Sequence, residues 1–132
     1  MIWLIRTAML DMMPAHQNLP GLAATHLEDF LQKLYRETTF LVWLGLVLGA
    51  VLYTLSPLLT VYLPLPSFLL PATLRDRHAD RICGTRFYLL RQSVFLLKMY
   101  ACMCWGQDPQ VRQLFSIAPY PEDPGSFRGS FE

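Results

Sequence analysis

Residues 38–74 read TTFLVWLGLVLGAVLYTLSPLLTVYLPLPSFLLPATL and contain no charged side chain. About 20 helical residues cross a hydrocarbon layer of about 30 Å, so this stretch is long enough to span a bilayer. A charge at the middle of a membrane helix costs about 2.5–3.5 kcal/mol, which makes a charge-free run typical of that environment. A buried helix of a soluble domain is the alternative, but a chain of 132 residues has little protein with which to surround it. We therefore predict an all-α membrane protein.

The predicted membrane segment leaves two topologies open. Proline removes a backbone donor and disfavours helix in the preceding residue, so Ser56-Pro57 marks a break or a kink. A helix that kinks there and continues to Leu63 crosses the membrane once, whereas a helical hairpin returns both ends to one side. Non-helical backbone at membrane depth must be covered by protein, so the hairpin itself implies a partner. We favour one transmembrane helix, followed by a Pro-rich connector over residues 64–72.

The N-terminal part divides into a leader and the start of this helix. Residues 1–24 are predicted to be weakly structured or to lie at the membrane interface, because Arg6 interrupts their short apolar run. Thr25 and Glu28 have the spacing of a capping box, in which a hydroxyl and a carboxylate three residues later satisfy the first backbone donors of a helix. Residues 25–63 are accordingly predicted to begin as an amphipathic helix and to run into the transmembrane helix.

The C-terminal part is predicted to be a helical docking region over residues 73–115, followed by an extended tail over residues 116–132 that is rich in proline and glycine. A short charged helix is expected over residues 73–81 and a long helix over residues 86–105. Asp108 and Pro109 are typical of an N-cap and a first helical position, which predicts a short helix ending near Phe115. Helical spacing points one stripe of the long helix inward, namely Phe87, Leu90, Val94, Leu97, Ala101 and Trp105.

Composition and flanking charge bear on partners and location. The net charge of +1, without a long basic tract, gives no reason to expect nucleic acid. The three cysteines, Cys83, Cys102 and Cys104, are irregularly spaced and do not form a disulfide framework. More arginines follow the apolar segment than precede it, so the positive-inside bias places the C-terminal region in the cytoplasm and the chain at the inner membrane.

Residues that could carry chemistry are not arranged for it. His16, His26 and His78 are far apart in the sequence and belong to no metal-ligand motif. Cys102-Met103-Cys104 lacks the downstream histidine of a haem-attachment motif, and helical positions two apart point in nearly opposite directions. Phosphate loops and nucleophile elbows are also missing. We therefore expect no catalytic, cofactor or metal site in this chain, and an enzyme acting on interfacial lipids is the least favoured hypothesis.

Arg91 and Lys98 are the charges of greatest interest, because they lie one heptad apart on an otherwise apolar helix. They make independent membrane insertion of that helix costly. Such side chains either extend to lipid headgroups, meet acidic groups of a partner, or lie on a solvated face. We take both as candidate partner-docking residues.

Residues 68–117 read FLLPATLRDRHADRICGTRFYLLRQSVFLLKMYACMCWGQDPQVRQLFSI. This region resembles the small accessory subunits of membrane-associated flavin dehydrogenases of the glucose-methanol-choline oxidoreductase group, of the gluconate 2-dehydrogenase subunit 3 type. The shared pattern is an arginine-bearing helix from Leu74 to Arg81, a long helix from Leu96-Leu97-Lys98 to Trp105, and the turn residues Asp108, Pro109 and Val111. The uncharged segment before this region and the Pro-rich tail after it depart from the family's pattern, which leaves the partner's identity open.

The resemblance implies a non-catalytic subunit that carries no flavin itself and supports a larger flavoprotein at the lipid bilayer. It adds Trp105, Asp108 and Pro109 to the candidate docking residues. The alternative function is that of a structural small subunit in a multi-chain respiratory or photosynthetic electron-transfer complex, surrounded by other membrane subunits.

Overall fold

The computed structural model describes residues 1–119 and 121, and it is all-helical over that part of the chain. Tyr120 and residues 122–132 lie outside it, so most of the predicted tail, residues 116–132, is not tested. The elements in chain order are α1 (Ile2–Met12), η1 (Leu22–Ala24), α2 (Leu27–Glu37), α3 (Phe40–Leu55), α4 (Pro57–Thr60), η2 (Ser67–Leu69), α5 (Ala72–Cys83), α6 (Tyr88–Gln107) and α7 (Pro109–Leu114).

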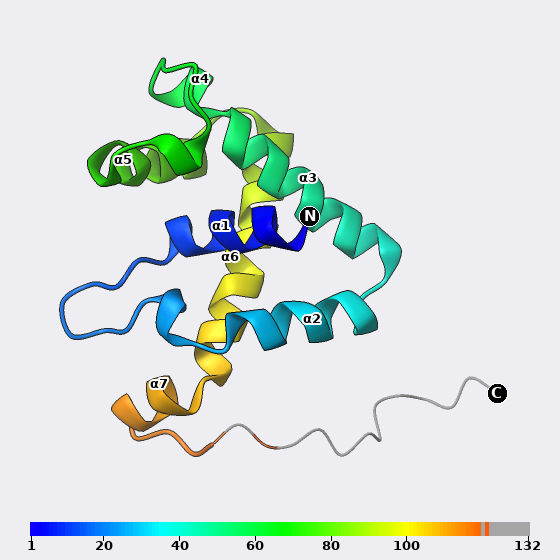
Figure 1. Ribbon diagram of the computed structural model, residues 1–132, viewed down its shortest axis with the longest axis vertical. Coiled ribbons are helices and arrows are strands. Elements are labelled where there is room, and N and C mark those ends of the chain that lie inside the picture. The colour runs from blue at the N-terminus through cyan, green and yellow to red at the C-terminus, as the bar shows by residue number, and fades with distance from the viewer. Residues whose placement is uncertain (120, 122–132) are drawn as a thin grey trace.

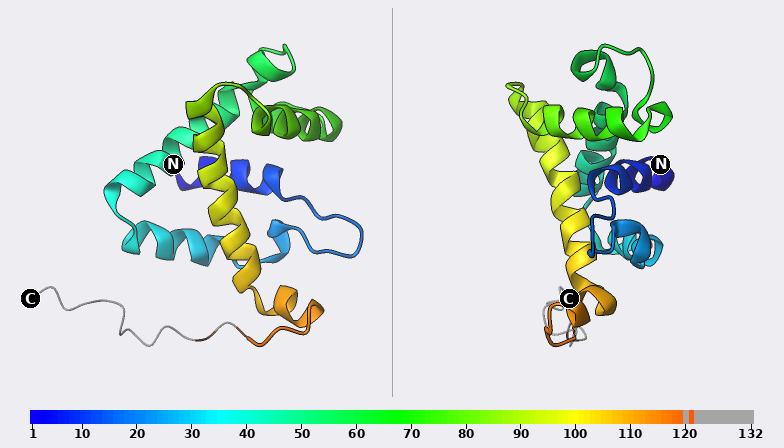
Figure 2. Two further views of the ribbon diagram at one scale, coloured as in Figure 1. Left: turned by 180° about the vertical axis from the view of Figure 1, so that it is seen from behind. Right: turned by 90° about the vertical axis from the view of Figure 1, so that its left-hand side faces the viewer.

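The longest helix, α6, runs the length of the molecule, from the end of α5 to α7 (Figure 1). Helices α1, α2 and α5 all lie on one side of α6, as the right-hand view of Figure 2 shows. Helix α3 packs directly against α6. The core between these helices is built from apolar side chains that are at most 1% exposed, among them Ile5, Met9, Leu22, Leu31, Leu46, Tyr53, Ile82, Val94 and Leu97.

The predicted transmembrane helix over residues 38–63 is not found. Among the described residues no helix combines the length and the apolar character that crossing a bilayer requires. Helix α3 has 16 residues and a length of about 24 Å, and it ends at Leu55 because Pro57 cannot donate the next backbone hydrogen bond. After the single turn of α4, residues 61–66 form an irregular connector. The apolar stretch is therefore divided between a helix, one further turn and a loop.

The expected continuous helix over residues 25–63 is also wrong, because the chain bends at Thr38-Thr39. Both threonines are extended, with ψ of 145° and 149°. Extended backbone suits these β-branched residues. The bend makes α2 and α3 two separate helices that run in different directions (Figure 1). The amphipathic character of α2 was predicted correctly, since Leu27 and Leu31 are buried while Glu28 and Asp29 face solvent.

Two further predictions for the N-terminal part fail. Residues 2–12 form a helix of the core, not a weakly structured leader, because Ile5, Ala8 and Met9 are at most 1% exposed. The predicted capping box does not form either. Helix α2 begins at Leu27, and the Thr25 hydroxyl donates instead to the carbonyl of Leu22 at 2.7 Å. That contact stabilises the preceding turn, η1.

The predictions for the C-terminal region are largely confirmed. Both ends of helices α5, α6 and α7 lie within two residues of the expected bounds. In the predicted inner stripe of α6, Val94, Leu97 and Ala101 are buried, and Leu90 and Trp105 are half-buried. Phe87 is the exception at 71% exposed, because it precedes the first turn of α6.

Candidate docking surface

Helices α3 and α6 approach each other closely at two glycines. A Cβ atom at Gly49 would lie 2.7 Å from the carbonyl oxygen of Ser93, and one at Gly45 would lie 3.1 Å from a methyl group of Leu96. Small residues four apart on an apolar helix allow this approach of backbones. The Gly45-x-x-x-Gly49 spacing was visible in the sequence, and it is the signal that could have predicted this helix pair.

One side of the α3–α6 pair is covered by protein. Ala50 and Tyr53 of α3 and Leu97 and Ala101 of α6 are fully buried. Helix α1 packs against both members of the pair. The two helices therefore share a common inner side, and the opposite side of each faces away from the core.

The outer side of α3 is a row of exposed leucines with no charge in it. Leu41, Leu48 and Leu55 are 77%, 51% and 65% exposed, and Leu44 and Leu52 are each 39% exposed. Their spacing of three and four residues places them in one stripe along the helix. Leucine is common on protein surfaces singly, but a continuous row of five is a candidate interaction site.

The outer side of α6 continues this surface. Tyr88 and Phe95 are 61% and 60% exposed, and Met99 and Met103 follow at 39% and 47%. These residues also recur at helical spacing, on the side of α6 that faces away from α1, α2 and α5 (Figure 2). We name the combined surface the outer face; it comprises Leu41, Leu44, Leu48, Leu52, Leu55, Tyr88, Phe95, Met99 and Met103.

Arg91 and Lys98 border the outer face and are both exposed. With Cys83, Gln92, Val94 and Phe95 they line a half-open cavity of about 420 Å³. This lining contains two cationic groups and no acidic residue. The two predicted docking residues are thus placed where acidic groups of a partner could reach them.

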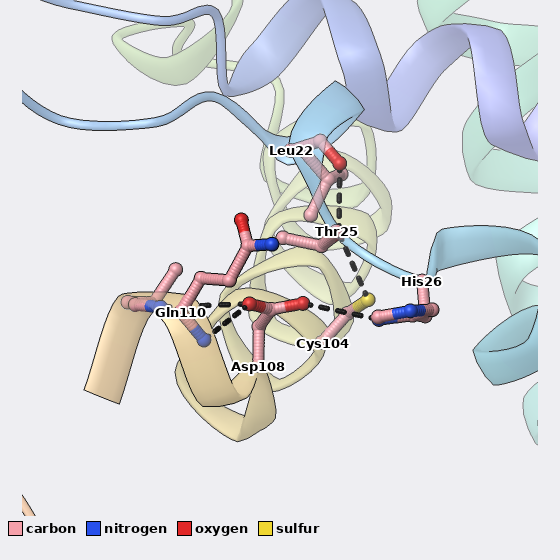
Figure 3. A network of polar contacts seen from close by, with 7 residues as sticks. Leu22, Thr25, His26, Cys104, Asp108 and Gln110 are labelled. Atoms are coloured by element: carbon pink, nitrogen blue, oxygen red, sulfur yellow. Dashed lines mark hydrogen bonds and ion pairs between the residues drawn. The ribbon is translucent and has the colours of Figure 1, made fainter. Parts of the chain in front are cut away.

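Asp108 is used within the fold (Figure 3). Its side chain is almost fully buried, and its Oδ1 accepts hydrogen bonds from the backbone N–H groups of Gln110 at 2.9 Å and Val111 at 3.4 Å. Its Oδ2 lies 3.3 Å from Nδ1 of His26, at the start of α2. The predicted N-cap is confirmed, and the same carboxylate connects α7 to the N-terminal part of the chain.

Trp105 and Pro109 complete this end of the molecule. The indole N–H of Trp105 donates to the carbonyl of Pro20 at 2.8 Å, and its ring meets the ring of Phe115 edge-on at 6.0 Å. Pro109 is exposed at the first position of α7. The structure therefore places Trp105 and Asp108 in intramolecular contacts and leaves Arg91, Lys98 and Pro109 accessible.

Cys83, Cys102 and Cys104 are all free thiols. Cys104 is buried with its Sγ 3.7 Å from the hydroxyl of Thr25, and burial raises the pKa of its thiol (Figure 3). A neutral thiol is a weak nucleophile. Cys83 and Cys102 are exposed and unpaired. Within residues 1–119 and 121, no group of three His, Cys, Asp or Glu side chains could hold a metal ion.

A second polar network, which the sequence did not predict, joins α3, α4 and α5. His78 is fully buried, with Nε2 3.0 Å from the carbonyl oxygen of Tyr53 and Nδ1 2.6 Å from the hydroxyl of Thr60. Because a carbonyl only accepts, Nε2 carries a proton, and in the neutral ring Nδ1 then accepts from Thr60. Arg81 donates to the carbonyl of Thr60. Both ring nitrogens of His78 are thus occupied, and burial lowers its pKa.

Comparisons of the chain with protein-family models, with curated proteins and with solved structures give no match.

Proposed function

We propose that this chain is a non-catalytic accessory subunit that docks a flavin-dependent dehydrogenase of the glucose-methanol-choline type at the membrane, with the flavin bound by the partner. The observation that carries the proposal is the outer face. It is two helices wide, uncharged and mostly apolar, with Gln92 exposed among the α6 side chains, and it is open to solvent over the described residues. A large exposed apolar surface is typical of a site that another protein covers.

The composition of the outer face suits a protein partner. Tyr88 and Phe95 supply aromatic anchors, and residues of this kind are enriched in interface cores. Met99 and Met103 are flexible and fit irregular surfaces. Arg91 and Lys98 at the border favour a partner with acidic groups in matching positions, which adds specificity to a contact driven by apolar burial.

The resemblance of residues 68–117 to the gluconate 2-dehydrogenase subunit 3 type is what names the partner class. Two of the motif residues, Trp105 and Asp108, make intramolecular contacts that hold α6 and α7 in place. The motif therefore supports a helical unit like that of the accessory subunits. The outer face is the surface through which this unit would bind its partner.

One observation favours the alternative, a structural small subunit of a respiratory or photosynthetic complex. The leucine row of α3 lacks any polar side chain that would give specificity. A row of this kind could equally be covered by the apolar subunits of a large membrane complex.

The test is to purify the tagged full-length chain from its native membranes in mild detergent. The visible spectrum is recorded, and co-purifying proteins are identified by mass spectrometry. A flavin spectrum together with a large oxidoreductase of the glucose-methanol-choline group supports the proposal. Haem or chlorin bands with many small apolar subunits point to the alternative, and a colourless solitary chain rejects both.

A variant pair locates the contact. Leu48→Glu combined with Met99→Glu places two charges in the outer face and should reduce recovery of the partner at least about tenfold, because buried unpaired charges are costly. Leu114→Glu is the control, since Leu114 is 58% exposed on α7, outside the outer face. Arg91→Leu and Lys98→Leu should each weaken association if they pair with acidic groups. Equal recovery with all these variants contradicts docking through the outer face.

A further inference from the structure

Residues 57–66, which we name the tip, project from one end of the molecule beyond α3 and α5 (Figures 1 and 2). They comprise α4 and the irregular connector of residues 61–66. Leu58 and Leu59 are 55% and 65% exposed, Tyr62 is 80% exposed and Leu65 is 43% exposed. The tip is uncharged, and its Leu58 and Leu59 follow Leu55, the last leucine of the α3 row in the outer face, by three and four residues.

The backbone of the tip is held in one shape. Pro57, Pro64 and Pro66 restrict it at three positions. Tyr62 has a φ of 59°, a left-handed conformation that is costly for a bulky residue and persists where the surroundings enforce it. A loop held in this way presents its apolar side chains to the outside at little further entropic cost.

The polar groups at the α4 end of the tip have partners within the protein. The Thr60 hydroxyl contacts His78, and its carbonyl accepts from Arg81. The backbone N–H of Val61 donates to the carbonyl of Pro57 at 2.9 Å. These groups would be expensive to place in an apolar medium without partners, and the fold supplies the partners before any contact is made.

Cationic side chains lie beside the tip. Arg81 lines a groove of about 300 Å³ together with Leu59, Tyr62 and Phe87, and Phe87 is 71% exposed. Arg77 and Arg86 are also exposed near this end of the molecule, together with the acidic residues Asp76 and Asp80. Apolar, aromatic and arginine side chains thus lie together at this end of the molecule, and these are the residue types found between the hydrocarbon of a bilayer and its anionic headgroups.

We propose that the tip inserts into one leaflet of an anionic lipid bilayer, with Arg81 at the level of the headgroups. The chain would then lie on the membrane through a loop and not cross it. This inference rests on the membrane part of the proposed function and names the surface that makes the lipid contact. A protein groove is the less suitable occupant, because the tip has no charged side chain and Tyr62 is its one exposed residue with a polar group.

Flotation with lipid vesicles tests the proposal on the purified full-length chain. Vesicles of phosphatidylcholine with about 30 mol% phosphatidylglycerol should carry the chain upward in a density gradient, and vesicles of phosphatidylcholine alone should carry several-fold less. Leu58→Glu combined with Leu59→Glu should reduce flotation at least about tenfold, because both side chains leave the apolar layer. The matched control is Leu41→Glu combined with Leu48→Glu, which adds the same charge to the outer face. Circular dichroism checks that each variant is folded.

The results separate this inference from the docking proposal. Loss of flotation in the tip variant but not in the control supports insertion of the tip. Absence of flotation in the unaltered chain, or equal loss in both variants, overturns it. Equal flotation on the two kinds of vesicle overturns the preference for anionic headgroups. If the chain does not float but still co-purifies with a flavoprotein, insertion of the tip is refuted and the docking proposal stands. If the chain floats but recovers no flavoprotein, the docking proposal is refuted and insertion of the tip stands.

Discussion

The side chain of His78 shows how a single buried residue controls the junction of three helices. It bonds to Thr60 through one nitrogen and to the carbonyl of Tyr53 through the other, and its ring lies 4.7 Å from the ring of Tyr53. Burial disfavours the charged imidazolium and lowers the pKa of His78 below its ordinary value of 6.5. The neutral ring is therefore the form that the fold accepts.

We predict that the protein loses stability in mild acid through His78. Below the ordinary histidine pKa the unfolded chain takes up a proton that folded His78 does not, so the free energy of unfolding falls as the pH falls from about 7.5 to about 5.5. Urea denaturation at the two pH values measures this. His78→Gln should be less stable at the higher pH and should lose part of the pH dependence, whereas His16→Gln, at an exposed position, should retain it. An unchanged pH dependence in His78→Gln contradicts the prediction.

Asp108 is the other residue whose role can be isolated. We expect Asp108→Ala to reduce the free energy of unfolding by about 1 kcal/mol, because the N-cap bonds of α7 are lost. Asp108→Asn keeps an acceptor for those bonds and should retain more of the stability than the alanine variant. Chemical denaturation of the three proteins gives the comparison, and equal losses in the two variants would show that the charge beside His26 matters more than the cap.

At the level of elements, the contact between α3 and α6 organises the fold, and Gly49 is where it is tightest. Gly49→Ala should lower the free energy of unfolding by roughly 1–3 kcal/mol, since the added carbon would overlap the backbone carbonyl of Ser93 and push the helices apart. Helix propensity alone favours alanine and would raise the free energy of unfolding. A fall therefore shows that the lost packing outweighs the gain in propensity. Gly106 of α6 has no atom within 4 Å of an added Cβ, and Gly106→Ala should be neutral or stabilising by up to about 1 kcal/mol. Thermal or urea denaturation of the pair decides.

The molecule as a whole is one-sided, with α1 packed on the inner side of the α3–α6 pair and the outer face open. We predict that the isolated chain self-associates with rising concentration in the absence of a partner, because exposed apolar area is removed from water when two copies meet. Leu48→Lys combined with Leu52→Lys should keep it monomeric. These positions are exposed, so the free energy of unfolding should change by no more than about 0.5 kcal/mol per substitution. Analytical ultracentrifugation measures association, and a monomeric unaltered chain at all accessible concentrations contradicts the prediction.

Much of the helical content could be read from local patterns. The bounds of α5, α6 and α7 follow from helical spacing, from the Asp108-Pro109 start signal and from the change of composition around Gly84, all of which act within a few residues. The amphipathic face of α2 was readable for the same reason. Of the candidate site, Arg91 and Lys98 were recognisable because charges on an otherwise apolar helix are conspicuous in any environment.

The structure that the uncharged stretch adopts depends on contacts between segments distant in the sequence. An apolar helix suits lipid and a protein core equally well, and whether α3 lies in one or the other is decided by its neighbours. Residues 2–12 form one of those neighbours, and their sequence has no clear amphipathic pattern that would have predicted a core helix. The approach of Gly45 and Gly49 to α6 and the burial of His78 against Thr60 both require segments 18 or more residues apart to meet. Local periodicity carries no information about such meetings, because each is selected by the free energy of the whole packed core.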